Sequence, residues 1–192
     1  MTSRWVVAAA EERGLLVRWK SFSLAKLNEG KPLPAFLDTP EFRAKMDLAA
    51  AALRVLQAAI SHGDNDAAGR LYAEWGVRFH EAGREPTPDL LEEVAAAAGA
   101  RELLAKADDP ALDAAITASL EEALRLAGPE VGSPVIHLDG AQRGTFGPIV
   151  SPPPVGEEAG RLWDAVVALS GIDSFFELKR GRTGPPVFGP SR

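Results

Sequence analysis

Side chains able to do covalent or metal chemistry are sparse in this chain of 192 residues. It has no cysteine, so its residues supply no thiolate nucleophile, thiolate-bound metal or disulfide. The three histidines, His62, His80 and His137, stand far apart in sequence, and this spacing does not indicate a zinc site. We therefore expect no metal cofactor.

The stretch "VGSPVIHLDG", residues 131–140, places a proline beside a predicted strand. Residues 135–138 form an apolar run typical of a β-strand, and Asp139-Gly140 predicts a tight hairpin turn. Proline cannot donate to a strand ladder, so Pro134 belongs at the start of the strand rather than inside it. Ser133 and Pro134 would then form a lip, although the residues alone favour an ordinary strand start.

An α/β pattern occupies both ends of the chain. Residues 3–13 have helix-forming composition, and alternating apolar residues in 15–24 predict a strand. Near the other end, the periods of 135–138 and 145–150 predict a hairpin, and residues 157–169 an amphipathic helix. These elements together predict one α/β core.

The middle of the chain, residues 39–128, has helical periodicity throughout. Thr39, Thr87 and Asp109 each precede a proline, a pattern typical of a helix N-cap followed by proline at the first helical position. We expect an all-helical insertion here. The predicted organisation is a core in two parts, residues 1–38 and 129–180, the insertion of residues 39–128, and a Pro/Gly-rich tail of residues 181–192.

The composition argues against two classes of partner, nucleic acids and membranes. The net charge of -6 and the lack of any Lys/Arg block argue against a nucleic-acid surface. No apolar run approaches the roughly 18 residues that a membrane span needs, and the start "MTSRWVV" lacks the features of a secretion signal. We expect a cytoplasmic protein with no membrane partner.

Several stretches carry a resemblance to a known family. They are "TSRW" at 2–5, "SLAKLNEG" at 23–30, "HG" at 62–63, "RFHEAG" at 78–83, "VGSPVIHLDG" at 131–140, "FGPIVSPPPVGEEAGRLWD" at 146–164 and "FFELKR" at 175–180. In these the chain resembles DsbA-like oxidoreductases, and among them the mycothiol-dependent nitroreductases. The resemblance implies a thioredoxin-like core with an all-helical insertion (the lid), lacking the first β-strand.

The resemblance also implies roles for particular residues. Pro134 matches the cis-proline of thioredoxin-like proteins, and the backbone of Ser133 would pair with a thiol-bearing ligand. Asn28 and His80 match positions near the thiol site and are expected to contact the cofactor. A turn-forming asparagine and a histidine at a helix C-terminus remain open as alternatives for these two. Phe36 stands where relatives tend to carry tyrosine, which weakens any expected cofactor contact there.

The resemblance places a Cys-Pro-Trp-Cys motif, and a strand before it, immediately ahead of the residues that match 2–5. We therefore expect this chain to be truncated before the motif and inactive as given, with no catalytic residue of its own; the other reading is a redox-inactive relic. The missing strand would be central in the sheet and would leave two edges unpaired. We expect the chain to fold poorly alone or to take a strand from another copy.

The implied function is that of a DsbA-like thiol-disulfide oxidoreductase. A cysteine thiolate would attack a disulfide or a small electrophile, which accepts the electrons. The reaction would pass through a mixed disulfide with a low-molecular-weight thiol such as mycothiol, which the second cysteine or another thiol then releases. Partners would be a small-molecule thiol or electrophile, with protein disulfides and a homodimer left open. Two alternatives remain: a non-redox protein that binds a thiol cofactor, and an enzyme like the kappa-class glutathione transferases and isomerases. Enzymes of that class use a serine at the start of this helix to activate the thiol, but Ser3 lies several residues past the expected place.

Overall fold

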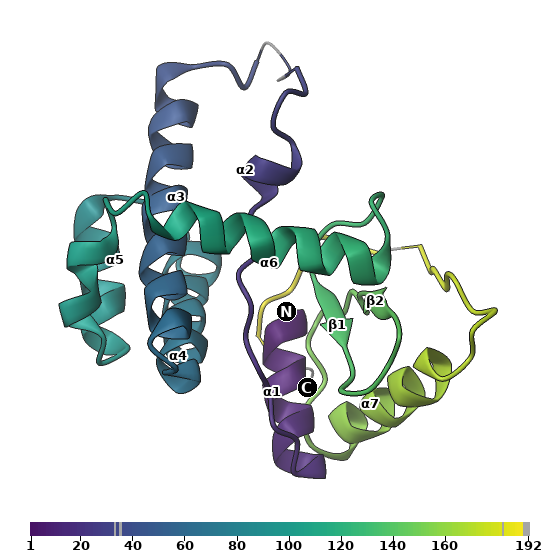
Figure 1. The fold of residues 1–192 in the computed structure, drawn as a ribbon. Helices are drawn as coiled ribbons and strands as arrows, with labels where there is room; N and C mark the ends of the chain where they lie inside the picture. Colours follow the sequence, from purple (N-terminus) through teal and green to yellow (C-terminus); the bar gives the residue numbers. More distant parts are fainter. Residues whose placement is uncertain (33, 35, 182, 190–192) are drawn as a thin grey trace. The chain divides into compact units, whose positions relative to one another are not determined.

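The chain divides into two compact units, one of helices and a two-stranded sheet and the other of helices. The structure, a computed structural model (Figure 1), describes residues 1–32, 34, 36–181 and 183–189. One unit comprises Met1–Val17 and Ala123–Arg192, and the other Arg18–Glu122. No helix among the described residues is both long and apolar enough to cross a membrane.

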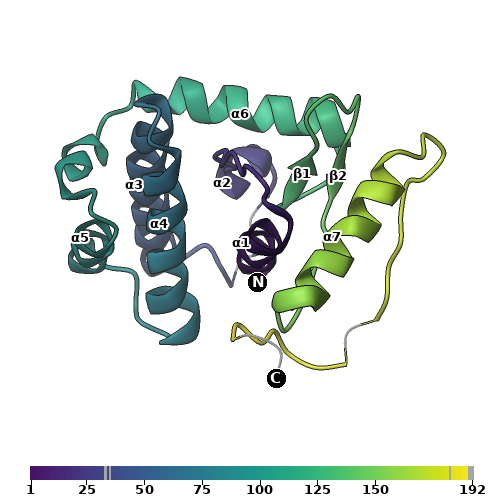
Figure 2. The same cartoon turned by 90° about the horizontal axis from the view of Figure 1, so that it is seen from below.

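The first unit contains helix α1 (Thr2–Arg13), strands β1 (Val135–His137) and β2 (Gly144–Phe146), and helix α7 (Gly156–Ser170). Helix α1 ends as predicted, because Gly14 takes a left-handed conformation with φ 62° and donates its N–H to the carbonyl of Ala10. The view in Figure 2 looks nearly along the axis of α1 and shows it beside α7. The predicted helix over 157–169 is confirmed to within one residue at each end.

Trp5 is the centre of the packing between α1 and α7. Its side chain is fully buried, and its indole N–H donates to the carbonyl of Ala159 at 3.0 Å. Its ring lies tilted against Trp163, with the centroids 6.1 Å apart. Because Ala159 and Trp163 both belong to α7, one side chain of α1 fixes both the separation and the rotation of the two helices.

A group of charged residues closes the far end of the same helix pair. The Arg13 guanidinium donates to Asp164 at 2.9 Å and to Glu157 at 3.2 Å. These contacts hold the pKa of Asp164 below its usual range. Gly160 lies beneath them, and a β-carbon at this position would come within 2.4 Å of the guanidinium. The helix therefore carries glycine where the arginine crosses it.

The predicted hairpin is present, but its strands are shorter than predicted, since β1 ends at His137 and β2 at Phe146. β1 and β2 pair antiparallel, with Ile136 opposite Thr145. Asp139-Gly140 does centre a turn, in which the Ala141 N–H donates to the Leu138 carbonyl at 3.0 Å. However, the strands are joined by residues 138–143 rather than by these two alone. Strand β1 ends at His137 because the Leu138 carbonyl is hydrogen-bonded within the turn and not to β2.

The strand predicted over residues 15–24 is wrong. Residues 15–23 are assigned neither helix nor strand, and Leu24 starts the short helix α2 (Leu24–Leu27). The alternation itself is real: Leu15 is half-buried while Leu16 is 98% exposed. An extended segment becomes a strand only through hydrogen bonds to a neighbour, and within the described chain this one has no ladder partner.

The second unit is helical, as predicted for most of it. After α2 come α3 (Pro40–Ser61), α4 (Asn65–Trp75), the π-helical turn η1 (Gly76–Glu81), α5 (Pro88–Ala97), the 3₁₀ turn η2 (Arg101–Lys106) and α6 (Leu112–Ala127), whose residues from Ala123 onward belong to the first unit. The predicted caps are confirmed for Thr39 and Thr87, whose hydroxyls accept from the third residue of each helix. The predicted start at Asp109-Pro110 is early, because the Asp109 carboxylate accepts from Ala111 and α6 begins at Leu112.

The core of the second unit lies between α3, α4 and α5. Its buried residues are mostly alanine, valine and leucine: Val55, Ala59, Ala67, Ala68, Leu71, Leu91, Val94, Ala95, Ala98 and Ala100. A paired contact links α3 to α6, where two guanidinium nitrogens of Arg54, Nε and Nη2, donate to Asp113, at 2.7 and 2.8 Å. This hydrogen bonding lowers the pKa of the Asp113 carboxyl. Small residues let the helices approach closely, and the charged pair fixes α6 against α3.

Candidate functional site

The lip formed by Ser133 and Pro134 precedes β1 directly. Ser133 is exposed, and within the part of the chain that the structure describes it makes no hydrogen bond. The Ser133–Pro134 peptide is cis, as are the bonds before Pro148 and Pro152. The carbonyl of Pro134 is occupied, because it accepts the N–H of Gly147 at 2.9 Å. Ser133 therefore offers a hydroxyl, an N–H and a carbonyl to a ligand.

The lip is connected to the start of α1. Gly147, which bonds Pro134, is followed by Pro148, and the Pro148 carbonyl accepts the hydroxyl of Thr2 at 2.9 Å. Thr2 is the first residue of α1 and is buried. One dipeptide thus holds both the lip and the helix N-terminus, where the helix dipole favours negative charge.

Asn28 follows the last residue of α2 and is exposed. Its side-chain amide donates to the Leu24 carbonyl at 2.8 Å, and its side-chain carbonyl accepts from Lys31 at 3.2 Å. Both ends of the side chain therefore close the short helix. This is the local role that a turn-forming asparagine plays, and a ligand would have to share or displace these bonds.

His80 lies on the π-helical turn η1 and is exposed. Its imidazole packs edge-on against Phe79, with ring centroids 4.8 Å apart, and Phe79 in turn lies against Trp75 at 5.9 Å. Asn28 and His80 belong to the second unit, whereas Ser133 and Pro134 belong to the first. Of the four predicted site residues, Ser133 and Pro134 are therefore neighbours in one unit, whereas Asn28 and His80 belong to the other unit.

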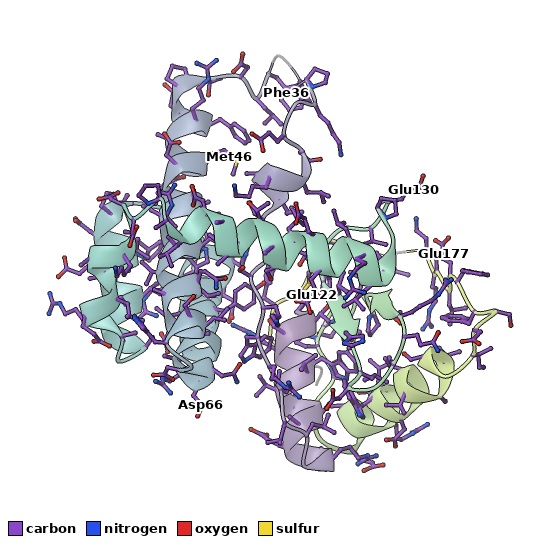
Figure 3. The ribbon with its side chains drawn as sticks, in the orientation of Figure 1. Phe36, Met46, Asp66, Glu122, Glu130 and Glu177 are labelled. Carbon is purple, nitrogen blue, oxygen red and sulfur yellow. The ribbon has the colours of Figure 1, made fainter. Side chains whose placement is uncertain are left out.

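The described residues do not supply a nucleophilic thiol or a metal site. The chain has no cysteine, and no group of three or more His, Asp or Glu side chains is arranged for a metal within the described ranges. Its hydroxyl, amide and main-chain groups can bind and orient a polar ligand. Phe36 is 79% exposed, in the loop before α3, and gives such a ligand no hydroxyl (Figure 3).

Two features were not predicted from sequence. One is the π-helical turn Gly76–Glu81 after Trp75, within the residues 39–128 for which helical periodicity predicted helices without distinguishing their type. The other is an open apolar pocket in the second unit. Helical periodicity identified the apolar faces that line it but does not reveal where those faces leave space.

Comparisons with known proteins identify the family of this chain. The family described as mycothiol-dependent nitroreductase Rv2466c matches residues 1–180. The chain is also 27% identical over 191 residues to the uncharacterized protein Rv2286c of Mycobacterium tuberculosis (strain ATCC 25618 / H37Rv), an alignment covering 97% of this chain and 78% of that protein. With the family match extending over nearly the whole chain, the protein belongs to the Rv2466c-like family of mycothiol-dependent nitroreductases.

Proposed function

We propose that this protein acts in reductions that depend on a low-molecular-weight thiol of the mycothiol type, as a DsbA-like thiol-disulfide oxidoreductase. The observation that carries the proposal is the family match over residues 1–180. The thiol supplies the reducing sulfur when bound. The protein's own part is to bind this ligand, orient it and keep it beside the start of α1.

Ser133 and Pro134 are the proposed binding lip. The exposed main chain of Ser133 can pair with the amide groups of an extended ligand, as a strand end does. The bonds from Pro134 to Gly147 and from Pro148 to Thr2 support a rigid lip next to the helix N-terminus. In this arrangement a thiolate at the lip would be stabilised by the positive end of the helix dipole.

Asn28 and His80 are proposed as further contacts to the polar groups of the thiol ligand. The Asn28 side chain already donates to Leu24 and accepts from Lys31, so a ligand would share it with these partners, and its contribution is expected to be smaller than that of Ser133. His80 is exposed and its ring is oriented by Phe79. We also propose that the protein accepts protein disulfides as substrates and that it forms a homodimer.

The reactive protein thiolate of this chemistry is not among the 192 residues, since they include no cysteine. We propose that it is supplied by a Cys-Pro-Trp-Cys motif encoded ahead of Met1. The absence of cysteine also favours a second candidate, a protein that binds the thiol without redox turnover. Reading the coding sequence upstream of Met1 separates them, because an in-frame Cys-Pro-Trp-Cys supports the first and a stop codon supports the second.

Binding is tested by titrating the chain with reduced mycothiol and, separately, with glutathione, followed by amide chemical shifts. We expect saturable shifts at Gly132, Ser133 and Val135, with smaller ones at Asn28 and His80, and weaker binding of glutathione. Ser174, an exposed serine of the same unit, provides the control position. No saturable mycothiol binding, or shifts spread equally to Ser174, would overturn the proposal. Disulfide-reductase activity of these 192 residues would overturn the account of the nucleophile.

A further inference from the structure

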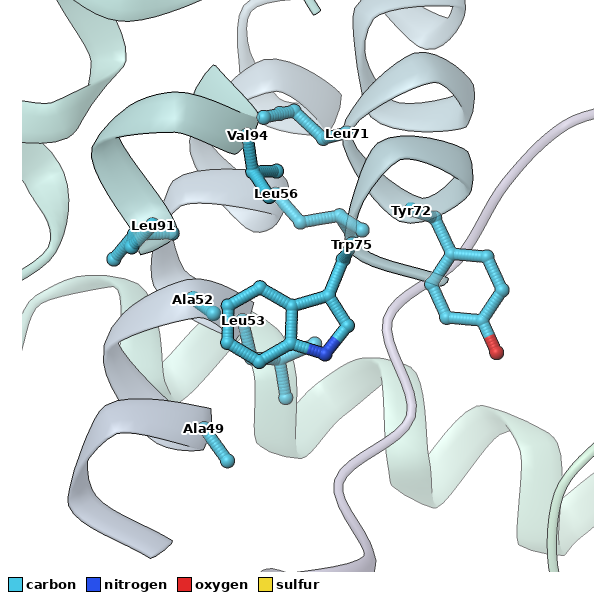
Figure 4. A pocket seen from close by; sticks show the side chains of 9 residues that line it. All are labelled: Ala49, Ala52, Leu53, Leu56, Leu71, Tyr72, Trp75, Leu91 and Val94. Carbon is cyan, nitrogen blue, oxygen red and sulfur yellow. The ribbon is translucent and has the colours of Figure 1, made fainter. Parts of the chain in front are cut away.

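The second unit contains a pocket that the proposed thiol chemistry does not use. It opens between α3, α4 and α5 and has a volume of about 140 Å³. Most of its lining is aliphatic, and two aromatic side chains complete it: Ala49, Ala52, Leu53, Leu56, Leu71, Tyr72, Trp75, Leu91 and Val94. Figure 4 shows the aliphatic side chains around the Trp75 indole, with the Tyr72 hydroxyl pointing away from them.

The chemistry of the lining selects a neutral ligand. None of the lining side chains carries a charge, and partial burial raises the pKa of the Tyr72 hydroxyl above its ordinary value, so it stays protonated at neutral pH. A charged or strongly polar ligand would lose hydrogen bonds to water there without replacement. The Tyr72 hydroxyl points away from the aliphatic side chains, so the Trp75 indole N–H is the polar group left beside a ligand, which suits at most a single polar substituent.

The size of the pocket selects one ring. A cavity of roughly 150 Å³ lined by aliphatic and aromatic side chains is known to stay dry and to hold benzene. The pocket here, at about 140 Å³, has the same capacity and a similar lining. Two fused rings or a thiol conjugate would exceed it.

The backbone beside the pocket supplies an independent observation. Trp75 is the last residue of α4, and the π-helical turn η1 begins at the next residue. π-helical turns are rare and occur frequently at functional sites. Phe79, on this turn, lies against Trp75 with the ring centroids 5.9 Å apart, so the indole that lines the pocket is also held by a second aromatic ring.

We propose that this pocket is a binding site for a small, neutral, single-ring aromatic compound, with Trp75 as the stacking wall. The ligand would lie among the aliphatic side chains of α3 and α5, against the face of the Trp75 indole. The site is separate from the lip in sequence and in chemistry, and its existence does not depend on thiol binding.

The test uses the whole chain and two fluorinated probes observed by ¹⁹F NMR. We expect fluorobenzene to bind saturably and 4-fluorobenzoate to bind more than about tenfold more weakly, because its carboxylate would have to be desolvated. In Ala49→Leu the added side chain should occupy the pocket and weaken fluorobenzene binding by more than about tenfold. Ala44→Leu is the matched control, since Ala44 is an exposed residue of α3 outside the lining.

Three results would overturn the proposal: no saturable fluorobenzene binding, equal binding of the two probes, or equal binding by Ala49→Leu and the unsubstituted chain. Circular dichroism checks that each variant is folded. If Ala49→Leu does not fold, the comparison of the two probes on the unsubstituted chain still decides.

Discussion

Replacing Trp5 by phenylalanine should destabilise the first unit by removing one buried hydrogen bond and part of a buried ring. The indole N–H that bonds the Ala159 carbonyl at 3.0 Å has no counterpart in phenylalanine. Losing a buried hydrogen bond costs about 1 kcal/mol. The smaller ring gives up on the order of 40 Å² of buried apolar surface, worth about 1 kcal/mol at the usual transfer coefficient. The expected loss in the free energy of unfolding is about 2 kcal/mol.

Urea denaturation followed by far-ultraviolet circular dichroism measures this loss without relying on tryptophan fluorescence, which the substitution itself changes. Val7→Ala is the matched control, because Val7 lies on the same helix but is 47% exposed. It should change the free energy of unfolding by less than about 0.5 kcal/mol. If the two units unfold in separate transitions, only the one that involves α1 should move.

The reasoning is refuted if Trp5→Phe and Val7→Ala unfold with the same free energy. That result would mean that the contact with α7 does not limit the stability of the first unit. A loss well above 4 kcal/mol would also count against it, because costs of that size accompany removal of a whole aromatic side chain rather than part of one.

The remaining predictions concern glycines, charge and the sheet edge. Gly69→Ala should lower the free energy of unfolding by about 1–3 kcal/mol, because the new β-carbon would come within 2.7 Å of the Trp19 indole. Gly160→Ala should change it by less than about 1 kcal/mol, since the Arg13 guanidinium is the end of a flexible side chain that can shift and alanine favours the helix. Urea titrations of both variants check this. Asp113 has a lowered pKa in the folded chain, so its pairing contributes stability above its unfolded pKa of about 3.9 and loses it as the pH falls through the lower folded pKa. Asp113→Asn should therefore flatten the acid side of the stability profile, and an unchanged profile would contradict this. Because β1 is paired on one side only in the described chain, we expect either low thermal stability or self-association, and a sharp melt of a strictly monomeric sample in light scattering would contradict it.

Sequence was most informative about the helices because their signals are local. The Thr-Pro pairs at 39 and 87 predict N-caps whose hydroxyl accepts a main-chain N–H a few residues later, and the structure has both bonds. Gly14 ends α1 in the left-handed conformation for which glycine is favoured. The same local logic misplaced the start of α6, because an Asp-Pro pair can form a turn before a helix as readily as its cap.

Strand predictions depended on partners that the sequence does not identify. The alternation in residues 15–24 does describe how the side chains are buried, since Leu16 is exposed while Leu15 and Val17 are half-buried. A ladder, however, needs a second backbone alongside, and within the described chain this segment has none. The hairpin was found because both of its strands and its turn lie within a short stretch of sequence.

The candidate site also has features that the sequence predicted and features that it did not. Ser133 and Pro134 were identified as a lip from the chemistry of proline and from family resemblance, and the structure adds the bonds that tie this lip to α1. The engagement of Asn28 with Leu24 and Lys31 could not be read from sequence, because it depends on how a four-residue helix closes. The apolar pocket was hidden because a stripe of apolar residues looks the same whether its neighbours fill the space or leave it open.

The small sheet explains why the helix pair matters so much to the first unit. An isolated two-stranded hairpin is at best marginally stable in water. Here the hairpin is held by contacts outside its ladder, including the Thr145 hydroxyl beside that of Ser170 in α7 at 3.4 Å and the bond from Thr2 to Pro148 just after β2. Both contacts end on the helices that Trp5 packs together. Loosening Trp5 should therefore speed amide exchange of Ile136 and Thr145 as well as lower global stability, and exchange that changes only in α1 would show that the hairpin is stable independently.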